Sequence, residues 1–184
     1  MIKLYFQEIE NAKSYSESFA LKILSEYLNV DEKSLVVLRD RFGKPYLKDY
    51  PETHFNISHT KGAIVCAVSD KQVGIDIEGL RKVNYKIAEK YFAEADNEYI
   101  FSEVKGQDNR FIEVWTKKEA YVKWVGKGME IPFDSFDTIG KDNVVSFMIW
   151  DYFVSLSSEK DRKSNRLHRN IPSPRGLVKS QRKP

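Results

Sequence analysis

The alternation of residue types from Gly74 to Glu78 is the feature that most restricts how this 184-residue chain can fold. Two isoleucines alternate with Asp76 and Glu78, which is the two-residue period of a β-strand. The isoleucines therefore share one face of the strand and the two carboxylates share the other. Apolar residues on both sides of the run indicate a mostly buried strand. A buried carboxylate pair is costly unless a cation or several hydrogen-bond donors compensate for the lost solvation.

Magnesium is a cation that suits such a pair. It takes oxygen ligands, keeps several waters, and is usually held by one or two carboxylates together with substrate phosphates. The alternative is an edge strand whose acidic face is simply solvated. The strand therefore predicts either a magnesium site that handles a phosphate ester or an ordinary acidic surface.

A second segment, Asn109 to Val125, is predicted to be a helix that carries a third acid and a lysine. Glu119 and Lys123 are four residues apart and share one face of this helix. They can act together on one ligand, or they can form an ordinary surface pair. The glycine-lysine-glycine sequence at 126–128 follows as a flexible turn that could approach a phosphate closely.

A third polar group lies in the run from His54 to Gly62. Phe55 and Ile57 alternate as in a strand, and the residues from Ser58 onward are predicted to form the turn that follows. Ser58 offers a hydroxyl and His59 an imidazole, and both can contact a phosphate. A zinc site is disfavoured, because the chain has one cysteine and its three histidines lack finger spacing.

These segments together resemble the 4'-phosphopantetheinyl transferase superfamily. The resemblance is closer to the surfactin-synthetase-activating type, which has two halves in one chain, than to the short trimeric type of fatty-acid synthesis. The motifs that carry it run from Arg41 to Phe136: Gly43-Lys44-Pro45, Phe55-Asn56-Ile57-Ser58-His59, Gly74-Ile75-Asp76-Ile77-Glu78, Trp115-Thr116-Lys117-Lys118-Glu119-Ala120 and Gly126-Lys127-Gly128.

The resemblance implies an enzyme with holo-[acyl-carrier-protein] synthase activity. Members of the family move the 4'-phosphopantetheine arm of coenzyme A onto a serine of an apo acyl or peptidyl carrier protein, and adenosine 3',5'-bisphosphate is released. Asp76, Glu78 and Glu119 match the family's magnesium ligands, with the coenzyme pyrophosphate completing the shell. Lys123 matches the lysine that contacts the transferred phosphate.

The resemblance also assigns residues to the coenzyme and to the reaction. Lys44 matches a lysine near the adenine end of coenzyme A. Ser58 and His59 match the pair that meets the coenzyme phosphates, the histidine chiefly the 3'-phosphate. Asp76, Glu119 and Lys123 are the expected catalytic residues, and Glu119, or a water that it orients, is the expected base for the carrier serine.

The region from Gln7 to Ser25 departs from the family pattern. Larger members carry a basic stretch ahead of the first long helix, which helps to hold the 3'-phosphate. Here the region offers only Lys13 and Lys22 and also holds three glutamates, so the N-terminal half looks abbreviated. This departure supports an alternative function, a catalytically weak homologue that binds coenzyme A or a carrier protein without turnover.

The order of predicted elements indicates two similar halves. A strand, helices and further strands occur twice, with a seam near Asp70 to Val73, and one closing strand is expected at Phe136 to Ile139. We therefore predict a mixed α+β fold of two similar strand-helix-strand halves packed pseudo-symmetrically. An N-terminal half-domain occupies residues 1–72, and a C-terminal half-domain with the metal site occupies residues 73–158. A monomer is expected, because two halves in one chain can build a site that shorter relatives form between subunits.

Residues 159–184 differ in composition from the rest of the chain. They hold nine Lys or Arg and two acids, so this tail carries +7 while the other residues carry −4, within a total of +3. Such a basic segment with little apolar content is predicted to be disordered. It could contact nucleic acid or an acidic carrier protein, or be appended sequence. Specific nucleic-acid binding by the whole chain is not expected.

The remaining composition indicates a cytoplasmic protein. The longest apolar runs are too short to span a membrane, and the N-terminus lacks the apolar region of a signal peptide. The single Cys66 fits a reducing interior without disulfides, and it is expected to be a small buried apolar residue.

Overall fold

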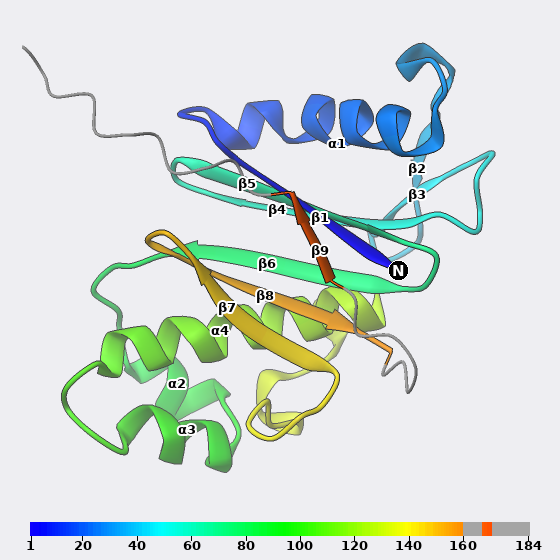
Figure 1. The fold of residues 1–184 in the computed structure, drawn as a ribbon. Coiled ribbons are helices and arrows are strands. Elements are labelled where there is room, and N and C mark those ends of the chain that lie inside the picture. Colours follow the sequence, from blue (N-terminus) through cyan, green and yellow to red (C-terminus); the bar gives the residue numbers. More distant parts are fainter. Residues whose placement is uncertain (160–166, 171–184) are drawn as a thin grey trace, which may run out of the picture.

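The computed structural model describes residues 1–159 and 167–170 and arranges them in four layers (Figure 1). A helix covers a first sheet, a second sheet packs on the other side of the first, and further helices cover the second sheet. The predicted mixed α+β class is confirmed. In chain order the elements are β1 (Ile2–Glu8), α1 (Ala12–Leu28), the 3-10 turn η1 (Glu32–Ser34), β2 (Val37–Arg39), β3 (Pro45–Leu47), β4 (His54–Thr60), β5 (Ala63–Ser69), β6 (Val73–Gly79), α2 (Lys86–Tyr91), α3 (Glu94–Phe101), α4 (Gln107–Val125), η2 (Gly128–Glu130), η3 (Phe133–Ser135), β7 (Val144–Ile149), β8 (Tyr152–Ser158) and β9 (Leu167–Asn170).

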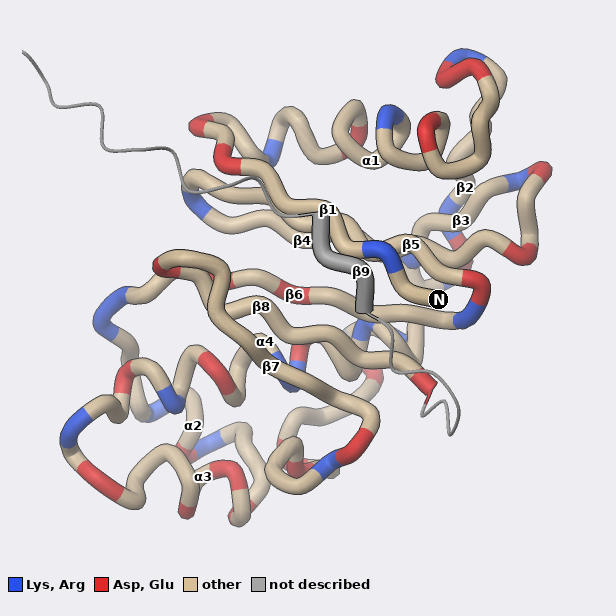
Figure 2. The backbone as a smooth tube through the Cα atoms, viewed as in Figure 1, with Lys and Arg blue, Asp and Glu red and all other residues tan. Residues whose placement is uncertain are grey.

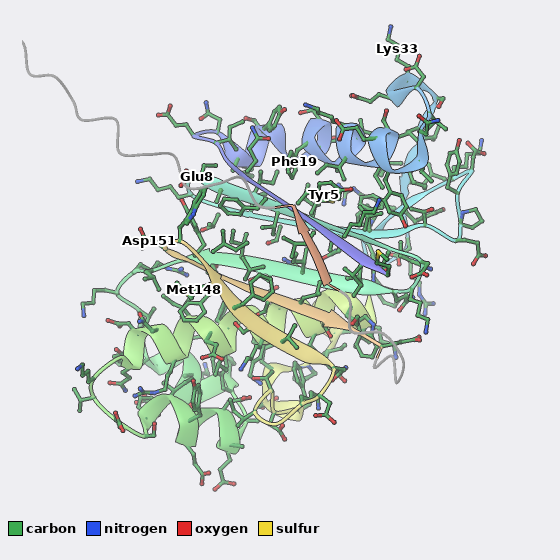
Figure 3. All side chains as sticks on the ribbon, in the orientation of Figure 1. Tyr5, Glu8, Phe19, Lys33, Met148 and Asp151 are labelled. Atoms are coloured by element: carbon green, nitrogen blue, oxygen red, sulfur yellow. The ribbon has the colours of Figure 1, made fainter. Side chains whose placement is uncertain are left out.

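The first sheet has the strand order β4-β5-β1-β9, and β2 with β3 forms a separate two-stranded sheet. Strand β5 pairs antiparallel with both of its neighbours, and Cys66 lies opposite Tyr5 on one side and Ile57 on the other. All seven residues of β5 are buried, since α1 covers one face of the sheet and the second sheet covers the other. Phe19 of α1 points toward the sheet, whereas Lys33 of η1 points away from it (Figure 3).

The second sheet has the order β6-β8-β7 and is antiparallel throughout. In each sheet one strand, β1 or β6, pairs with the second strand of a hairpin, β4-β5 or β7-β8. The core between the two sheets contains Leu4 and Val65 from the first sheet and Ile75, Ile77 and Val154 from the second. The isoleucine face that the alternation predicts therefore lies in this core.

Gly74 allows α4 to lie directly against β6. A Cβ atom built at Gly74 would lie 2.1 Å from the carbonyl oxygen of Ala120 and 2.3 Å from the backbone nitrogen of Trp124. No side chain larger than hydrogen fits such a gap, because the opposing atoms are backbone. This close approach sets the distance between the acidic face of β6 and the helix above it.

The helical layer is held together by aromatic side chains. Phe92 stacks on Phe111 with ring centroids 5.6 Å apart, and Phe111 stacks on Trp115 at 6.3 Å. Phe133 meets the edge of Trp115 at 5.6 Å. These contacts pack the end of α2 and the turn η3 against α4, and Trp115 belongs to this cluster. None of the helices in the described part of the chain combines the length and the apolar character that crossing a membrane requires.

Two sequence-based expectations are corrected by the fold. No strand forms at residues 136–139, because the carbonyl of Phe136 accepts a hydrogen bond from Lys118 and the N–H of Thr138 donates to Asp96. Within the tail that was expected to be disordered, residues 167–170 instead form β9, which pairs parallel to the outer edge of β1. That edge offers unpaired backbone groups for a further strand. The rest of the tail, residues 160–166 and 171–184, lies outside the described residues.

Candidate active site

Asp76 is the centre of a polar cluster that joins β4, β6 and α4. The residue is only 5% exposed. Its Oδ1 accepts a hydrogen bond from Nζ of Lys123 at 2.6 Å and another from Oγ of Ser58 at 2.7 Å. Lys123 also donates to the Ser58 hydroxyl at 3.0 Å. Three of the predicted site residues thus meet at Oδ1 of Asp76. Lys123 of α4 forms its ion pair with Asp76 of β6.

The polar face of β4 explains how this cluster assembles. Asn56, Ser58 and Thr60 alternate along the strand and point toward β6. The Asn56 Oδ1 accepts from the backbone N–H of Ile75 at 2.8 Å, and the Thr60 hydroxyl donates to Glu78 at 3.2 Å. The side chains of β4 therefore form hydrogen bonds both with the backbone edge of β6 and with its two acidic side chains.

Ser58 and His59 are placed differently from the expectation that they lie in a turn. Strand β4 continues to Thr60, so both residues are in extended backbone. Neighbouring side chains of a strand point to opposite faces, and accordingly Ser58 is buried at Asp76 while the His59 imidazole is exposed. The predicted pair is split, and His59 lies outside the contacts of the cluster.

Glu119 completes a group of three interacting acids. Burial raises the pKa of its carboxyl, and the negative charge of Asp76 raises it further. Lys123 lowers the same pKa, and Glu78 adds a smaller increase. The charges of both acids of β6 thus act on Glu119. Figure 2 marks acidic positions on β6 and both acidic and basic positions along α4.

Glu78 has its own cationic partner, which the sequence reasoning missed. Its Oε2 accepts a hydrogen bond from Nη1 of Arg81 at 2.8 Å in addition to the one from Thr60. Arg81 follows Glu78 by three residues, so the proximity in sequence could have indicated the pair. The contact with Thr60 had no local signal, because it depends on β4 lying beside β6.

The acids fit a divalent cation in part. Oδ2 of Asp76 is buried and has no hydrogen-bond partner among the described residues, and such an atom is costly unless something else satisfies it. Carboxylate oxygens are also the ligands that magnesium prefers. In the part of the chain that the structure describes, however, no group of three or more Asp, Glu, His or Cys side chains is arranged to hold a metal ion. Lys123 and Ser58 occupy Oδ1 of Asp76, and Arg81 and Thr60 occupy Oε2 of Glu78.

Lys44 connects the N-terminal half to the end of α4. Its Nζ donates to the carbonyl oxygens of Lys123 at 2.8 Å and Trp124 at 3.1 Å. The last carbonyls of a helix have no partner within the helix, and a cation there is favourable. Burial lowers the pKa of Lys44, and the charge of Asp40 opposes that shift.

Lys44 also lines the wall of a cleft of about 310 Å³ in the N-terminal half. Aromatic rings contribute to the same wall, and the cleft includes Tyr46, Tyr50, His54, Phe55 and Gln72. Lys44 thus lines this cleft and also contacts the backbone of Lys123, whose side chain belongs to the polar cluster.

Comparisons with known proteins place relatives of this chain in one family. Residues 72–166 match the family model described as the 4'-phosphopantetheinyl transferase superfamily. The 4'-phosphopantetheinyl transferase gsp of Aneurinibacillus migulanus is 44% identical over 118 residues, which cover 62% of this chain and 48% of that protein. The 4'-phosphopantetheinyl transferase Sfp of Bacillus subtilis (strain 168) is 28% identical over 151 residues, which cover 81% of this chain and 67% of that protein.

The matches extend over only part of these relatives, and the chain spans about half the length of the gsp protein. Among solved structures, the holo-[acyl-carrier-protein] synthase of Thermotoga maritima aligns with a TM-score of 0.40 and 18% sequence identity. That alignment covers 46% of this chain and 60% of the other.

Proposed function

Because the chain belongs to the 4'-phosphopantetheinyl transferase superfamily, we propose that it transfers the 4'-phosphopantetheine arm of coenzyme A to a serine of an apo acyl or peptidyl carrier protein. Adenosine 3',5'-bisphosphate is the second product. The observation that carries the proposal is the cluster in which Lys123 and Ser58 meet Asp76 next to Glu119. It combines the charges that an attack by an alcohol on a phosphoryl group requires.

Lys123 and Ser58 are the groups that face the transferred phosphate. The Lys123 side chain is 27% exposed, so its ammonium can exchange part of its contact with Asp76 for an anionic oxygen. Fixed cations of this kind stabilise the charge on the equatorial oxygens in the transition state. Ser58 adds a hydroxyl that can donate to the same phosphate. His59, exposed on the other face of β4, is proposed to meet the 3'-phosphate at the rim.

Glu119 is the proposed base for the carrier serine, directly or through a water. Its raised pKa lies closer to neutral pH than the pKa of an exposed glutamate does. A base whose pKa is nearer the working pH transfers protons more efficiently. Lys123 keeps the ionised form accessible, because its positive charge opposes the effect of burial.

Magnesium is the proposed cofactor, held by Asp76, Glu78 and Glu119. The unpartnered Oδ2 of Asp76 and the mutual repulsion of the three acids are the features of this chain that support it. When bound, the ion would neutralise charge on the coenzyme pyrophosphate. The contacts of Glu78 with Arg81 and Thr60 are both on Oε2, so Oε1 is the oxygen that Glu78 would offer to the ion.

The cleft beside Lys44 is the proposed site for the adenine end of the coenzyme. Its aromatic rings offer flat apolar surfaces, and Lys44 offers positive charge toward the cluster at Lys123. Aromatic side chains commonly stack on nucleobases. We propose that the chain works as a monomer, since β4, β6 and α4, which carry the residues of the cluster, all belong to one chain.

The first test is intact-mass spectrometry of an apo carrier protein incubated with the chain, coenzyme A and magnesium. A mass gain of one phosphopantetheine that disappears with EDTA would establish the transfer and its metal requirement together. No gain with several acyl and peptidyl carriers would contradict the proposal. Calorimetric binding of coenzyme A in that case would identify the chain as a binder without turnover.

A further inference from the structure

A second, fully buried ion pair lies on α4 outside the contacts of the active-site cluster. Nζ of Lys118 is 2.6 Å from Oδ2 of Asp96 in α3, and the two side chains have 0% exposure. The same ammonium donates to the carbonyl oxygens of Phe133 at 2.6 Å and Phe136 at 2.7 Å. The ammonium therefore makes two hydrogen bonds, both to backbone carbonyls, and one close ion pair with Oδ2 of Asp96.

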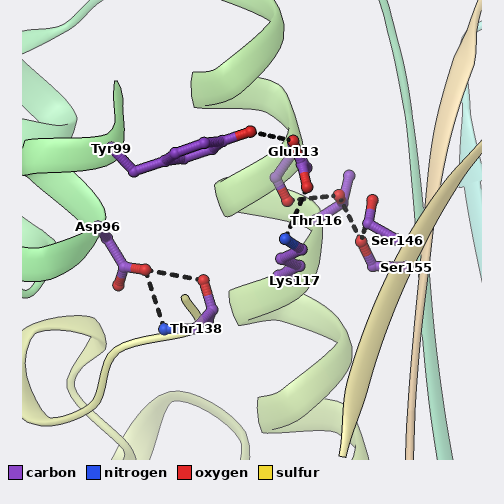
Figure 4. Close-up of polar contacts among 8 residues, drawn as sticks. All are labelled: Asp96, Tyr99, Glu113, Thr116, Lys117, Thr138, Ser146 and Ser155. Atoms are coloured by element: carbon purple, nitrogen blue, oxygen red, sulfur yellow. Dashed lines mark hydrogen bonds and ion pairs between the residues drawn. The ribbon is translucent and has the colours of Figure 1, made fainter. Parts of the chain in front are cut away.

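Asp96 extends this network to a third segment. Its Oδ1 accepts hydrogen bonds from the backbone N–H of Thr138 at 2.9 Å and from the Thr138 hydroxyl at 2.8 Å (Figure 4). Lys118 and Asp96 thus tie α4 to α3 and to the loop at residues 133–138. Because that loop has no regular backbone pairing at 136–138, its path depends on these side-chain contacts.

Stability alone is a poor reason for such an arrangement. Removing two charges from water costs about as much as their attraction returns, and well-packed apolar residues often serve a protein equally well. A buried pair does, however, impose one geometry, because each charge must reach its partner at hydrogen-bond distance. The direction of the helix and its rotation about its axis are then restricted.

The opposite side of α4 is also fixed. The hydroxyls of Thr116 and Ser155 are 2.8 Å apart and connect the helix to β8 (Figure 4), while Gly74 brings β6 against the backbone of Ala120 and Trp124. Lys118 is anchored to α3 and the loop, away from the sheet. Glu119 is the next residue in the chain, and Lys123 lies about one turn beyond Glu119 along the helix.

On this basis, and resting on the proposed transfer reaction, we propose that Lys118 and Asp96 are positioning residues that hold α4 in the rotation at which Glu119 and Lys123 reach Asp76. They touch neither the coenzyme cleft nor the cluster. Their effect is on the alignment of reacting groups, where a displacement of about 1 Å can cost about 100-fold in rate.

The experiment compares variants that separate position from stability. Lys118→Met leaves the buried Asp96 without its partner and can lower stability by itself. The double variant Lys118→Met/Asp96→Asn removes both charges, and the asparagine oxygen can still accept from Thr138. Lys117→Met is the matched control, because Lys117 is the neighbouring lysine of α4 and, among the described residues, forms its ion pair within the helix, with Glu113 at 2.6 Å (Figure 4).

Each purified variant is assayed for transfer to an apo carrier protein and for urea unfolding. We expect the double variant to keep a urea midpoint near that of the unmodified chain, with kcat at least about 10-fold lower and KM for coenzyme A changed less than about 3-fold. If the double variant has both the kcat and the urea midpoint of the unmodified chain, the inference is overturned. A loss in Lys117→Met as large as that in the double variant would also overturn it. If the double variant does not fold, Asp96→Asn is measured against the same limits.

A crystal structure of the double variant tests the inference independently of the reaction. The distance between Nζ of Lys123 and Oδ1 of Asp76, 2.6 Å in the unmodified chain, is expected to exceed hydrogen-bond range. An unchanged distance would overturn the inference even if turnover falls. If the unmodified chain transfers nothing, the proposed function fails, and this distance alone decides the positioning role.

Discussion

Replacing Gly74 with alanine is the sharpest test of how this fold builds its site. The added Cβ would lie 2.1 Å from the Ala120 oxygen, 2.3 Å from the Trp124 nitrogen and 2.8 Å from the Trp124 Cα. Real Cβ contacts essentially never fall below 3.0 Å, so the closest pair must separate by about 0.9 Å. The opposing atoms are backbone and cannot rotate away, so α4 as a whole has to move from β6.

This displacement has two expected consequences. Overpacking of this kind costs about 1–3 kcal/mol of stability, which corresponds to a urea midpoint lower by about 0.5–1.5 M for a slope near 2 kcal/mol per M. A shift of nearly 1 Å in the residues that α4 presents to Asp76 should also lower transfer about 100-fold. Both quantities are measured on the same purified Gly74→Ala protein, by urea unfolding followed through tryptophan fluorescence and by the carrier mass assay.

Gly79→Ala is the matched control on the same strand. A Cβ at Gly79 would lie 3.6 Å from the nearest atom, in the Tyr152 ring, which is ordinary van der Waals contact. We expect its midpoint and its transfer rate to stay close to those of the unmodified chain. The reasoning is refuted if Gly74→Ala matches Gly79→Ala in both measurements, because α4 then does not depend on the close approach at Gly74.

Four other outcomes are expected. Lys123→Ala should lower kcat about 100-fold, the usual cost of losing one charged donor at a reacting centre, and an unchanged rate in the mass assay would remove Lys123 from the site. Asp76→Asn should abolish magnesium-dependent transfer without lowering the urea midpoint, since it neutralises the unpartnered Oδ2; a midpoint well below that of the unmodified chain would show a structural role instead. Burial and Asp76 raise the pKa of Glu119, so the folded chain binds the proton more tightly and stability in EDTA should fall as the pH rises from the ordinary glutamate range through the folded pKa; Glu119→Gln should lose that slope, and an equal slope in both proteins would contradict the assignment. Burial raises the pKa of the Cys66 thiol to about 12, so a thiol reagent at pH 8 should modify it only at the rate of global unfolding, and rapid modification of the folded chain would contradict its burial.

Some of the site was readable from local patterns. The alternation at 74–78 predicted a strand with Asp76 and Glu78 on one face, and the helical spacing placed Glu119 and Lys123 on one side of α4. Both predictions depend on the repeat of a single element, which a short window of sequence contains. The pattern could not say whether Lys123 pairs with Glu119 along the helix or with Asp76 across to the strand.

Other parts were misread because side chains from distant segments decide them. Residues 136–139 have the composition of a strand, yet the carbonyl of Phe136 and the N–H of Thr138 are taken by Lys118 and Asp96. Ser58 and His59 were treated as a pair in a turn, and the continued strand sends them to opposite faces. The assignment of Lys44 to the coenzyme stays a prediction; its ammonium also donates to the last carbonyls of α4, a contact that no local pattern signals.

The sequence by itself determined which chemical groups this protein has and which face of each element carries them, because helix and strand periods are properties of consecutive residues. Only the tertiary structure decided which of these groups meet. The contacts of Asp76 with Ser58 and Lys123 join residues 18 and 47 positions apart, and they form because β4 lies along the edge of β6 while Gly74 lets α4 pack close to that strand. Which oxygen of Asp76 is paired and which is left unpartnered follows from that packing, since hydrogen bonds depend on distances that a linear sequence does not contain.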